Sequence, residues 1–338
     1  MTRRTPVIEG LSADALPLAA LLEAQAPAIL RGVARDWPLV RAGRESPGRA
    51  MDDLLSFYGG APVVGYEGGP EIAGRFFYSD DMTGMNFAAG RVRLDDWLDR
   101  LRAAPDGAAA LYVGSADLDG TLPGLRAENG FAPDAPMFGP RSPLASIWIG
   151  NRTIAAAHYD MSNNLACCLV GRRRFTLFPP DQVANLYPGP LEPTPGGQAV
   201  SMVDFAAPDF ALYPRFRAAL DAAEVAELEP GDLLFYPALW WHQVEALDGF
   251  NVMTNYWWNP SPAFMDSPMN TLLHGLLSLR DRPEAEKRGW RALFEHYVFG
   301  PADRAGAHLP EAARGALGPL DEPKARRLRA DLLRRLNR

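Results

Sequence analysis

Between residues 110 and 260 the sequence breaks into short aromatic and β-branched runs, separated by turns rich in Gly, Pro and Asp. The runs are ALYVGS, LASIWIGN, RFTLFPP, DLLFYP and NVMTNYWW. Short strands at this spacing are typical of an antiparallel sandwich or barrel. We therefore predict a mainly β domain with flanking helices.

Helical patterns stand on both sides of this β region. The first hundred residues mix short helical and strand-like runs, which we interpret as an α/β elaboration. After Pro262 come SPMNTLLHGLLSLRD, PEAEKRGWRALFEHYVFG and KARRLRADLLRRLNR, each with a helical pattern. We expect one domain over residues 1–262 and a helical segment over 263–338. Because three helices have too small a core to stand alone, they should pack on the β domain, on a second subunit, or on both.

One long connection interrupts the β region. Residues 179–228 are rich in Pro, Gly and Asp. A connection of that length inside a compact β domain is usually a lid or a binding loop. We therefore expect this segment to frame a site.

Charge and hydropathy narrow the classes of partner. The net charge of −7 argues against a general polyanion binder, so we expect no nucleic-acid partner. The last fifteen residues are strongly basic, but Leu328, Leu332 and Leu336 recur every fourth residue. This pattern favours a packed or subunit-facing helix over a nucleic-acid arm. No run approaches the ~18–20 apolar residues that span a bilayer, and we predict a cytoplasmic protein.

Two histidines and an aspartate are the candidate metal ligands. His158 and Asp160 lie two apart, so in a strand both side chains face the same side. The pair alone is equally compatible with a polar strand end. His242 follows PGDLLFYPALWW, and a histidine in such an apolar, aromatic setting is costly unless its nitrogens find partners. Two histidines and one carboxylate leave coordination positions open, as ferrous oxygenases require.

These stretches resemble the Jumonji-C/cupin-like dioxygenases. Residues 145–259 are most similar to the branch of asparaginyl hydroxylases that modify hypoxia-inducible transcription factor. The matching stretches are AAHYDMSNNLACCLVGRRRFTLFPPDQVANLYPGP, PGDLLFYPALWWHQVE and NVMTNYWW. The resemblance implies a double-stranded β-helix, Fe(II) held by His158, Asp160 and His242, and 2-oxoglutarate as cosubstrate.

The resemblance also implies which residues bind the cosubstrate. Its far carboxylate would be held by Arg173, where the similar hydroxylases have lysine, and strand parity places Arg173 on the face of Phe175. Arginine can hold a carboxylate bidentately, so the chemistry is retained. Tyr112 would contact the same carboxylate, and Asn164 and Asn255 would line the pocket.

Substrate residues are implied less directly. Tyr78 matches a position near the peptide substrate, and Trp257 shares a strand face with Asn255 and would wall the pocket; either is equally compatible with an ordinary packing role. Trp240 and Trp241 are expected to add to the aromatic shield. Ala155 stands where the similar hydroxylases have a threonine that touches the cosubstrate, so some binding energy should be missing.

The sequence predicts an Fe(II)- and 2-oxoglutarate-dependent hydroxylase that releases succinate and CO2. A protein or peptide side chain is the favoured substrate and a small molecule the alternative. TPGGQAVSMVDF lacks the polar substrate contacts of the similar loop, so asparagine hydroxylation is not carried over. A rival interpretation is a non-catalytic, metal-dependent, ligand-sensing module. The resemblance further implies a homodimer through the C-terminal helices.

Overall fold

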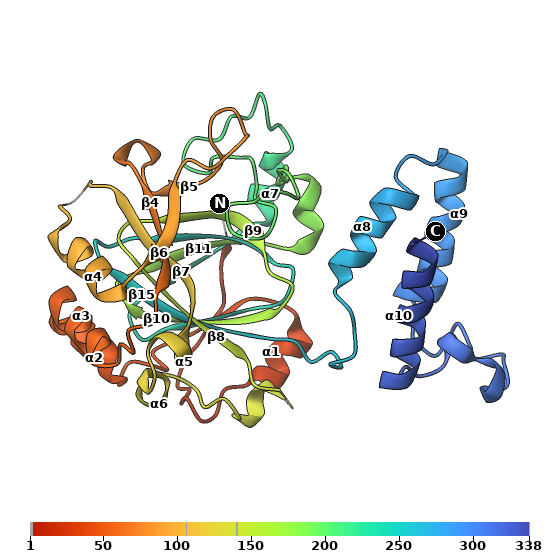
Figure 1. Cartoon of the computed structure of the whole chain (residues 1–338), viewed down its shortest axis with the longest axis horizontal. Coiled ribbons are helices and arrows are strands. Elements are labelled where there is room, and N and C mark those ends of the chain that lie inside the picture. The colour runs from red at the N-terminus through yellow and green to blue at the C-terminus, as the bar shows by residue number, and fades with distance from the viewer. Residues whose placement is uncertain (1–2, 106, 140, 338) are drawn as a thin grey trace. The chain divides into compact units, whose positions relative to one another are not determined.

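The computed structural model describes residues 3–105, 107–139 and 141–337 (Figure 1). The chain divides into two compact units, Met1–Pro260 and Ser261–Arg338. The first unit is built on two β-sheets and the second is helical. Among the described residues, no helix combines the length and the apolar character needed to cross a membrane.

Two sheets form the body of the first unit. The larger contains, in order across the sheet, β2 (Val7–Ile8), β3 (Ala28–Leu30), β13 (Leu233–Tyr236), β10 (Asn163–Val170), β15 (Asn251–Trp258), β8 (Leu144–Gly150), β7 (Ala110–Asp117), β4 (Val63–Gly68) and β6 (Ala88–Val92). The smaller contains β1 (Arg3–Arg4), β12 (Glu224–Leu228), β11 (Arg173–Phe178), β14 (Trp241–Ala246), β9 (Ile154–Tyr159) and β5 (Arg75–Phe76).

The chain crosses repeatedly between the two sheets from β8 onward. β8, β10, β13 and β15 belong to the larger sheet, whereas β9, β11, β12 and β14 belong to the smaller one. A separate apolar cluster fills the space between them, with Phe175 and Val244 from one sheet and Ala166 and Met253 from the other. This alternation is the double-stranded β-helix that was predicted, and it is confirmed.

The sequence of strand β10 is apolar from Leu165 to Val170 because both faces of the strand are covered. All eight of its residues are buried. Ala166 and Cys168 face the space between the sheets, whereas Leu165 and Cys167 face the helices outside. Since neighbouring strand residues point to opposite faces, a strand covered on both sides needs apolar residues on both faces, as β10 has from Leu165 to Val170.

Helices cover the outer face of the larger sheet, and their apolar side chains share one core with it. They are α1 (Leu18–Ala24), α2 (Pro38–Glu45), α3 (Pro47–Ser56), α4 (Leu94–Ala103), α5 (Leu118–Thr121) and α6 (Leu125–Glu128), with the short 3-10 turn η2 (Pro136–Phe138). Another 3-10 turn, η1 (Pro70–Ile72), lies in the connection from β4 to β5. The predicted N-terminal mixture of helices and strands therefore extends both sheets, and its helices pack against the larger one.

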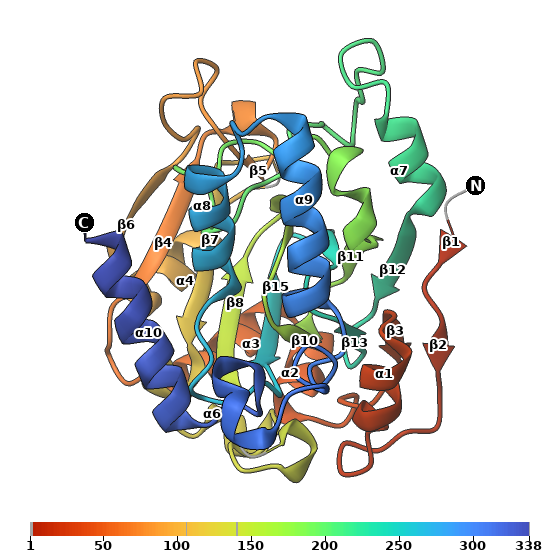
Figure 2. The same cartoon turned by 90° about the vertical axis from the view of Figure 1, so that its right-hand side faces the viewer.

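The connection predicted over residues 179–228 contains more regular structure than its composition suggested. It holds η3 (Pro180–Ala184), α7 (Phe216–Ala222) and β12, which pairs with β11 and with β1 (Figure 2). The prediction was wrong for this last part because Glu224 and Glu227 give β12 a polar appearance. Ala226 and Leu228 of β12 are buried in the core between the sheets.

The second unit contains α8 (Pro268–Ser278), α9 (Glu284–Phe294), a π-helical turn η4 (Glu295–Phe299), two 3-10 turns η5 (Glu311–Ala313) and η6 (Gly315–Leu317), and α10 (Glu322–Leu336). Ser267 caps α8, and its side chain accepts a hydrogen bond from the Met269 N–H. None of the three α-helices contains a buried residue. Most of their leucines, including Leu272, Leu273 and Leu277, are exposed.

Candidate metal centre

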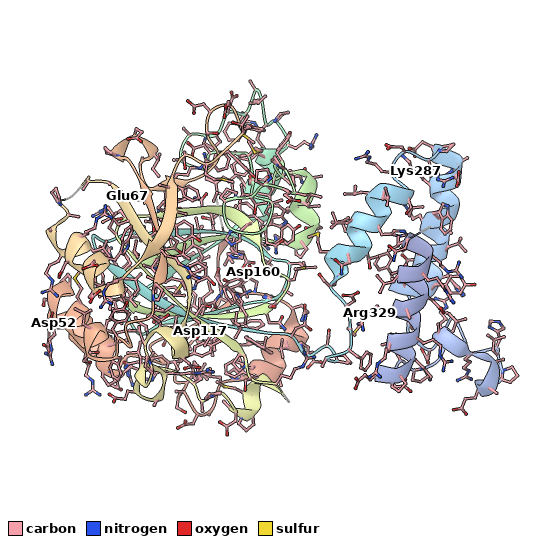
Figure 3. All side chains as sticks on the ribbon, in the orientation of Figure 1. Asp52, Glu67, Asp117, Asp160, Lys287 and Arg329 are labelled. Carbon is pink, nitrogen blue, oxygen red and sulfur yellow. The ribbon has the colours of Figure 1, made fainter. Side chains whose placement is uncertain are left out.

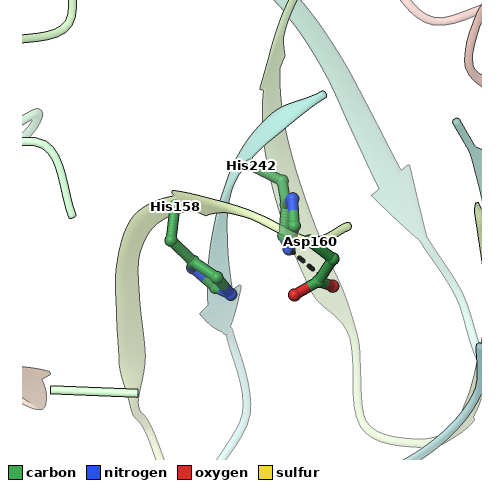
Figure 4. A group of neighbouring side chains, drawn as sticks. All are labelled: His158, Asp160 and His242. Carbon is green, nitrogen blue, oxygen red and sulfur yellow. Dashed lines mark ion pairs between the residues drawn. The ribbon is translucent and has the colours of Figure 1, made fainter. Parts of the chain in front are cut away.

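His158 and His242 face each other across two neighbouring strands. The antiparallel register of β9 and β14 pairs them directly, and their ring centroids lie 4.4 Å apart. Figure 4 shows both rings and the Asp160 carboxylate directed toward one another. The structure therefore brings together the three ligands that the sequence predicted, from two places in the chain.

A β-bulge in β9 directs His158 toward the interior. The register pairs Ala155 with Val244 and His158 with His242, so two residues of β9 oppose the single residue Gln243. Ala155 and His158 both line the same cavity, although residues three apart in a regular strand would face opposite sides. An extra residue of this kind re-aims the side chains that follow it.

Asp160 lies just beyond the end of β9. Its backbone carbonyl accepts a hydrogen bond of 2.7 Å from the Leu239 N–H, which fixes the chain there. The Asp160 Oδ2 atom is 3.6 Å from His242 Nε2. One candidate ligand atom from each of the three residues lies within 4.8 Å of the others. Figure 3 locates Asp160 among the side chains of the first unit, whereas Asp52 and Glu67 form exposed ion pairs with arginines.

Hydrogen bonds orient both imidazole rings for metal binding. His158 Nδ1 is 2.9 Å from the Ala156 carbonyl oxygen, and His242 Nδ1 is 2.9 Å from the Trp240 carbonyl oxygen. A carbonyl only accepts, so each Nδ1 carries the proton and each Nε2 keeps a free lone pair. This arrangement is typical of histidine ligands, whose second nitrogen donates to a carbonyl or carboxylate.

Burial keeps His242 in the neutral form that a metal requires. Desolvation, together with the neighbouring His158, lowers the pKa of His242 to about 4, although Asp160 acts in the opposite direction. The ring is therefore uncharged near neutral pH. Two neutral imidazoles and one carboxylate form a donor set that fits a divalent transition metal with open positions.

A cavity of about 380 Å³ opens beside these three residues. Besides Ala155 and the three candidate ligands, it is lined mainly by aromatic and small residues, most of which carry no functional signal in the sequence. They are Tyr66, Phe76, Phe87, Tyr112, Gly114, Ser115, Trp148, Ala156, Pro195, Gly196, Gly197, Gln198, Val200, Tyr236, Val244, Met253, Asn255 and Trp257. The segment Pro195–Gln198 belongs to the long connection, in agreement with its expected position at the site.

Arg173 is a buried cation without a visible partner. Its side chain is 2% exposed, and its Nε and Nη2 atoms have no hydrogen-bond partner among the described residues. Burial lowers the pKa of Arg173, while Tyr112 acts in the opposite direction. Burying an unpaired guanidinium is costly, so this position fits an anionic ligand such as a carboxylate. Arg172 and Arg174, in contrast, form exposed ion pairs.

Three further polar residues surround the cavity. Asn255 lines it, and the Asn255 amide donates a 2.8 Å hydrogen bond to Asn164 Oδ1, so Asn164 supports Asn255 from behind. Tyr236 was not predicted, although its ring lies 4.6 Å from that of His242. Burial raises the pKa of Tyr236, and the Asp160 charge raises it further. Burial also raises the pKa of Tyr112 to about 12, so both phenols are neutral donors.

Some predicted residues lie away from the cavity. Tyr78 is buried beside Ala156 and Val200, and its hydroxyl donates a 3.2 Å hydrogen bond to the Pro193 carbonyl. It therefore anchors the long connection, and a direct substrate contact stays a prediction. Neither Trp240 nor Trp241 lines the cavity. Trp240 packs in the apolar cluster between the sheets, whereas Trp241 packs outside the barrel with Phe216 of α7, because alternation turns it away from His242. Trp257 does line the cavity.

Comparison with models of known protein families identifies the family of this chain. A family model described as a cupin-like domain matches residues 14–264. The chain belongs to the cupin-like domain family. The predicted Jumonji-C/cupin-like membership is thus confirmed.

Curated relatives match only part of this cupin-like chain. Lysine-specific demethylase JMJ31 of Arabidopsis thaliana is 35% identical over 120 residues, covering 33% of the chain and 21% of the relative. tRNA wybutosine-synthesizing protein 5 of Danio rerio is 38% identical over 106 residues, covering 31% and 29%. HSPB1-associated protein 1 of Homo sapiens is 36% identical over 115 residues, covering 33% and 23%. The matched region spans less than a third of each of these relatives.

Proposed function

We propose that this cupin-like protein is an Fe(II)- and 2-oxoglutarate-dependent hydroxylase. The observation that carries the proposal is the pairing, in one barrel, of the His158, Asp160 and His242 cluster with the buried, unpartnered Arg173. Arg173 lies on β11 four residues before Leu177, which pairs with His242. A ligand with a metal-chelating end and a distant carboxylate uses both features, and 2-oxoglutarate is such a ligand.

Each residue has a role that follows from its contacts. His158 and His242 would hold the iron through Nε2, and Asp160 through its carboxylate. Arg173 would bind the far carboxylate with its free N–H groups, and the neutral Tyr112 hydroxyl would donate to the same group. Iron with 2-oxoglutarate and dioxygen would supply the oxidant for hydroxylation. The aromatic residues around the cavity would keep water from that oxidant and leave one C–H bond exposed to it.

A protein or peptide side chain is the substrate class that we favour. A second cavity of about 420 Å³ shares Asp160, Gln198 and Trp257 with the first, so the site continues toward the surface beyond the metal ligands. A continuous depression of this kind suits a polymer that inserts one side chain. The names of the relatives include both a lysine-specific demethylase and a tRNA-modifying protein, and a small molecule remains the alternative.

The test is turnover of the cosubstrate by purified, full-length protein. With Fe(II), ascorbate and 2-oxoglutarate, the protein should form succinate slowly even without its substrate, and a peptide library should accelerate succinate formation. His242→Ala should abolish succinate formation because it removes one of three metal ligands. A reduced, iron-loaded protein that neither binds nor consumes 2-oxoglutarate would refute the proposal.

A ligand-sensing module is the second candidate, and Ala155 favours it. This residue lines the cavity but offers no hydroxyl to a bound dicarboxylate. A sensor would bind a small ligand at the metal without consuming oxygen. Oxygen consumption measured at saturating 2-oxoglutarate separates the two, since a sensor would give none above that of free iron.

A further inference from the structure

Trp257 touches the candidate metal centre through a hydrogen bond, beyond lining the cavity. Its indole Nε1–H donates to Asp160 Oδ2 over 3.2 Å. This is the same oxygen that lies 3.6 Å from His242 Nε2. Asp160 lies beyond the end of β9, so no neighbouring strand holds its side chain, and the Trp257 indole contacts this carboxylate.

The three ligands are held in different ways. His158 and His242 each donate Nδ1–H to the carbonyl two residues earlier in their own segment. For Asp160, the Leu239 N–H fixes only the backbone. Within the described part of the chain, Trp257 is the one residue found donating a hydrogen bond to this carboxylate. Without it, the carboxylate would be free to rotate about its Cβ–Cγ bond.

We propose that Trp257 is a positioning residue that sets the orientation of the Asp160 carboxylate toward the metal. Trp257 lies in β15, where its backbone pairs with Asn164 of β10 and Leu144 of β8, so the strand register places the indole; its ring also packs edge-on against Trp148, with centroids 5.9 Å apart and an interplanar angle of 86°. A fixed N–H places Oδ2 beside His242 before any metal arrives. Hydrogen-bonded partners of metal ligands typically contribute about 10–100-fold to metal affinity or activity.

The chain supplies a matched control in Trp148. This indole lines the same cavity and contacts Trp257, yet its Nε1 is buried with no hydrogen-bond partner among the described residues. Trp257→Phe and Trp148→Phe therefore remove the same atoms from adjacent sites, but only the first removes a hydrogen bond to a ligand. Any difference between the two variants reports on that bond and not on lost aromatic packing.

The experiment measures Co(II) binding to the full-length protein without 2-oxoglutarate. We expect Trp257→Phe to raise the dissociation constant about 10–100-fold and to change the visible Co(II) absorption bands, which report ligand geometry. Trp148→Phe should keep the wild-type bands and affinity within about threefold. Wild-type behaviour of Trp257→Phe in both readouts would overturn the proposal, as would an equal effect of both variants.

Two further measurements keep the test decisive. Urea unfolding of the metal-free variants shows whether Trp257→Phe is folded. If it is not, 3-benzothienylalanine at position 257 keeps the size of indole and replaces the N–H with sulfur, and the same loss of Co(II) affinity is expected. The inference rests on the proposed metal centre: a wild-type protein that binds no Co(II) refutes both, whereas wild-type binding with an unaffected Trp257→Phe refutes the inference alone.

Discussion

Replacing Arg173 by methionine should separate the stability of this protein from its ligand binding. Methionine has a similar length and no charge, so the substitution removes the guanidinium and leaves the space filled. Arg173 is 2% exposed, and two of its side-chain nitrogens have no hydrogen-bond partner among the described residues. Burial lowers its pKa, which shows that the protein interior disfavours the charge.

We expect the metal-free Arg173→Met variant to be as stable as the wild type or more stable. Replacing buried ionic groups by well-packed apolar residues is often neutral, or stabilising by about 1–4 kcal/mol. Urea unfolding at one pH, without metal or ligand, measures the change in the free energy of unfolding.

Binding of 2-oxoglutarate should change in the opposite direction. The two free nitrogens can hold one carboxylate as a fork, and each hydrogen bond to a charged group contributes about 1.5–3 kcal/mol. Losing both therefore costs at least about 3 kcal/mol, which corresponds to a dissociation constant raised more than about 100-fold. Calorimetric titration of the Mn(II)-loaded protein with 2-oxoglutarate measures this constant without turnover.

Arg174→Met is the control on the neighbouring position. The Arg174 side chain is 41% exposed and pairs with Glu227 and Glu245. Such surface pairs contribute about 0–1 kcal/mol, so the control should lose little stability and no affinity. Our reasoning would be refuted if Arg173→Met bound 2-oxoglutarate as tightly as the control. It would also fail if the metal-free variant were destabilised by several kcal/mol, because Arg173 would then have a structural partner.

Three other outcomes follow from the structure. The protein without metal should lose stability as the pH falls from 6.5 toward 4, because the pKa of the buried His242 is lowered to about 4 and the unfolded chain therefore takes up the proton first. Urea unfolding measures this loss, which should depend less on pH in His242→Phe. Ala155→Thr adds a hydroxyl facing the cavity and should tighten 2-oxoglutarate binding by up to about tenfold in calorimetry, and weaker binding would show that the hydroxyl finds no partner. Light scattering should give a dimeric mass for the full-length protein and a monomeric mass for the double variant Leu273→Glu/Leu277→Glu, since both leucines are exposed on α8. A monomeric mass for the wild type would contradict this prediction.

The candidate metal ligands could be predicted from the sequence, whereas much of the cavity could not. His158, Asp160 and His242 stood out because their residue types and settings have a specific chemical use. Tyr236 and Trp148 carry no such signal, since an aromatic residue in a strand reads equally well as core. Trp257 was predicted as a wall, but its hydrogen bond to Asp160 depends on a neighbour 97 positions away.

The alternation of side chains along a strand predicts which residues of an unbroken strand face the core. This prediction fails where a bulge interrupts the strand. It assigned Arg173 to the inner face of β11, because side chains in an unbroken strand change sides at every residue. It could not place Ala155 and His158 on one face, since the bulge that does so depends on how β9 pairs with β14. Likewise, Glu224 and Glu227 concealed β12 until its partners β11 and β1 were seen.

The sequence alone thus determined the β domain, the helical segment and the three candidate ligands, because hydrophobic periodicity and side-chain chemistry are local properties. Only the tertiary structure decided that Arg173 is buried with two unpartnered nitrogens, that Trp257 donates a hydrogen bond to Asp160, and that Trp257 and Asp160 line one cavity. These properties depend on distances between residues far apart in the chain, and such distances arise only when the two sheets pack and exclude water from the space between them.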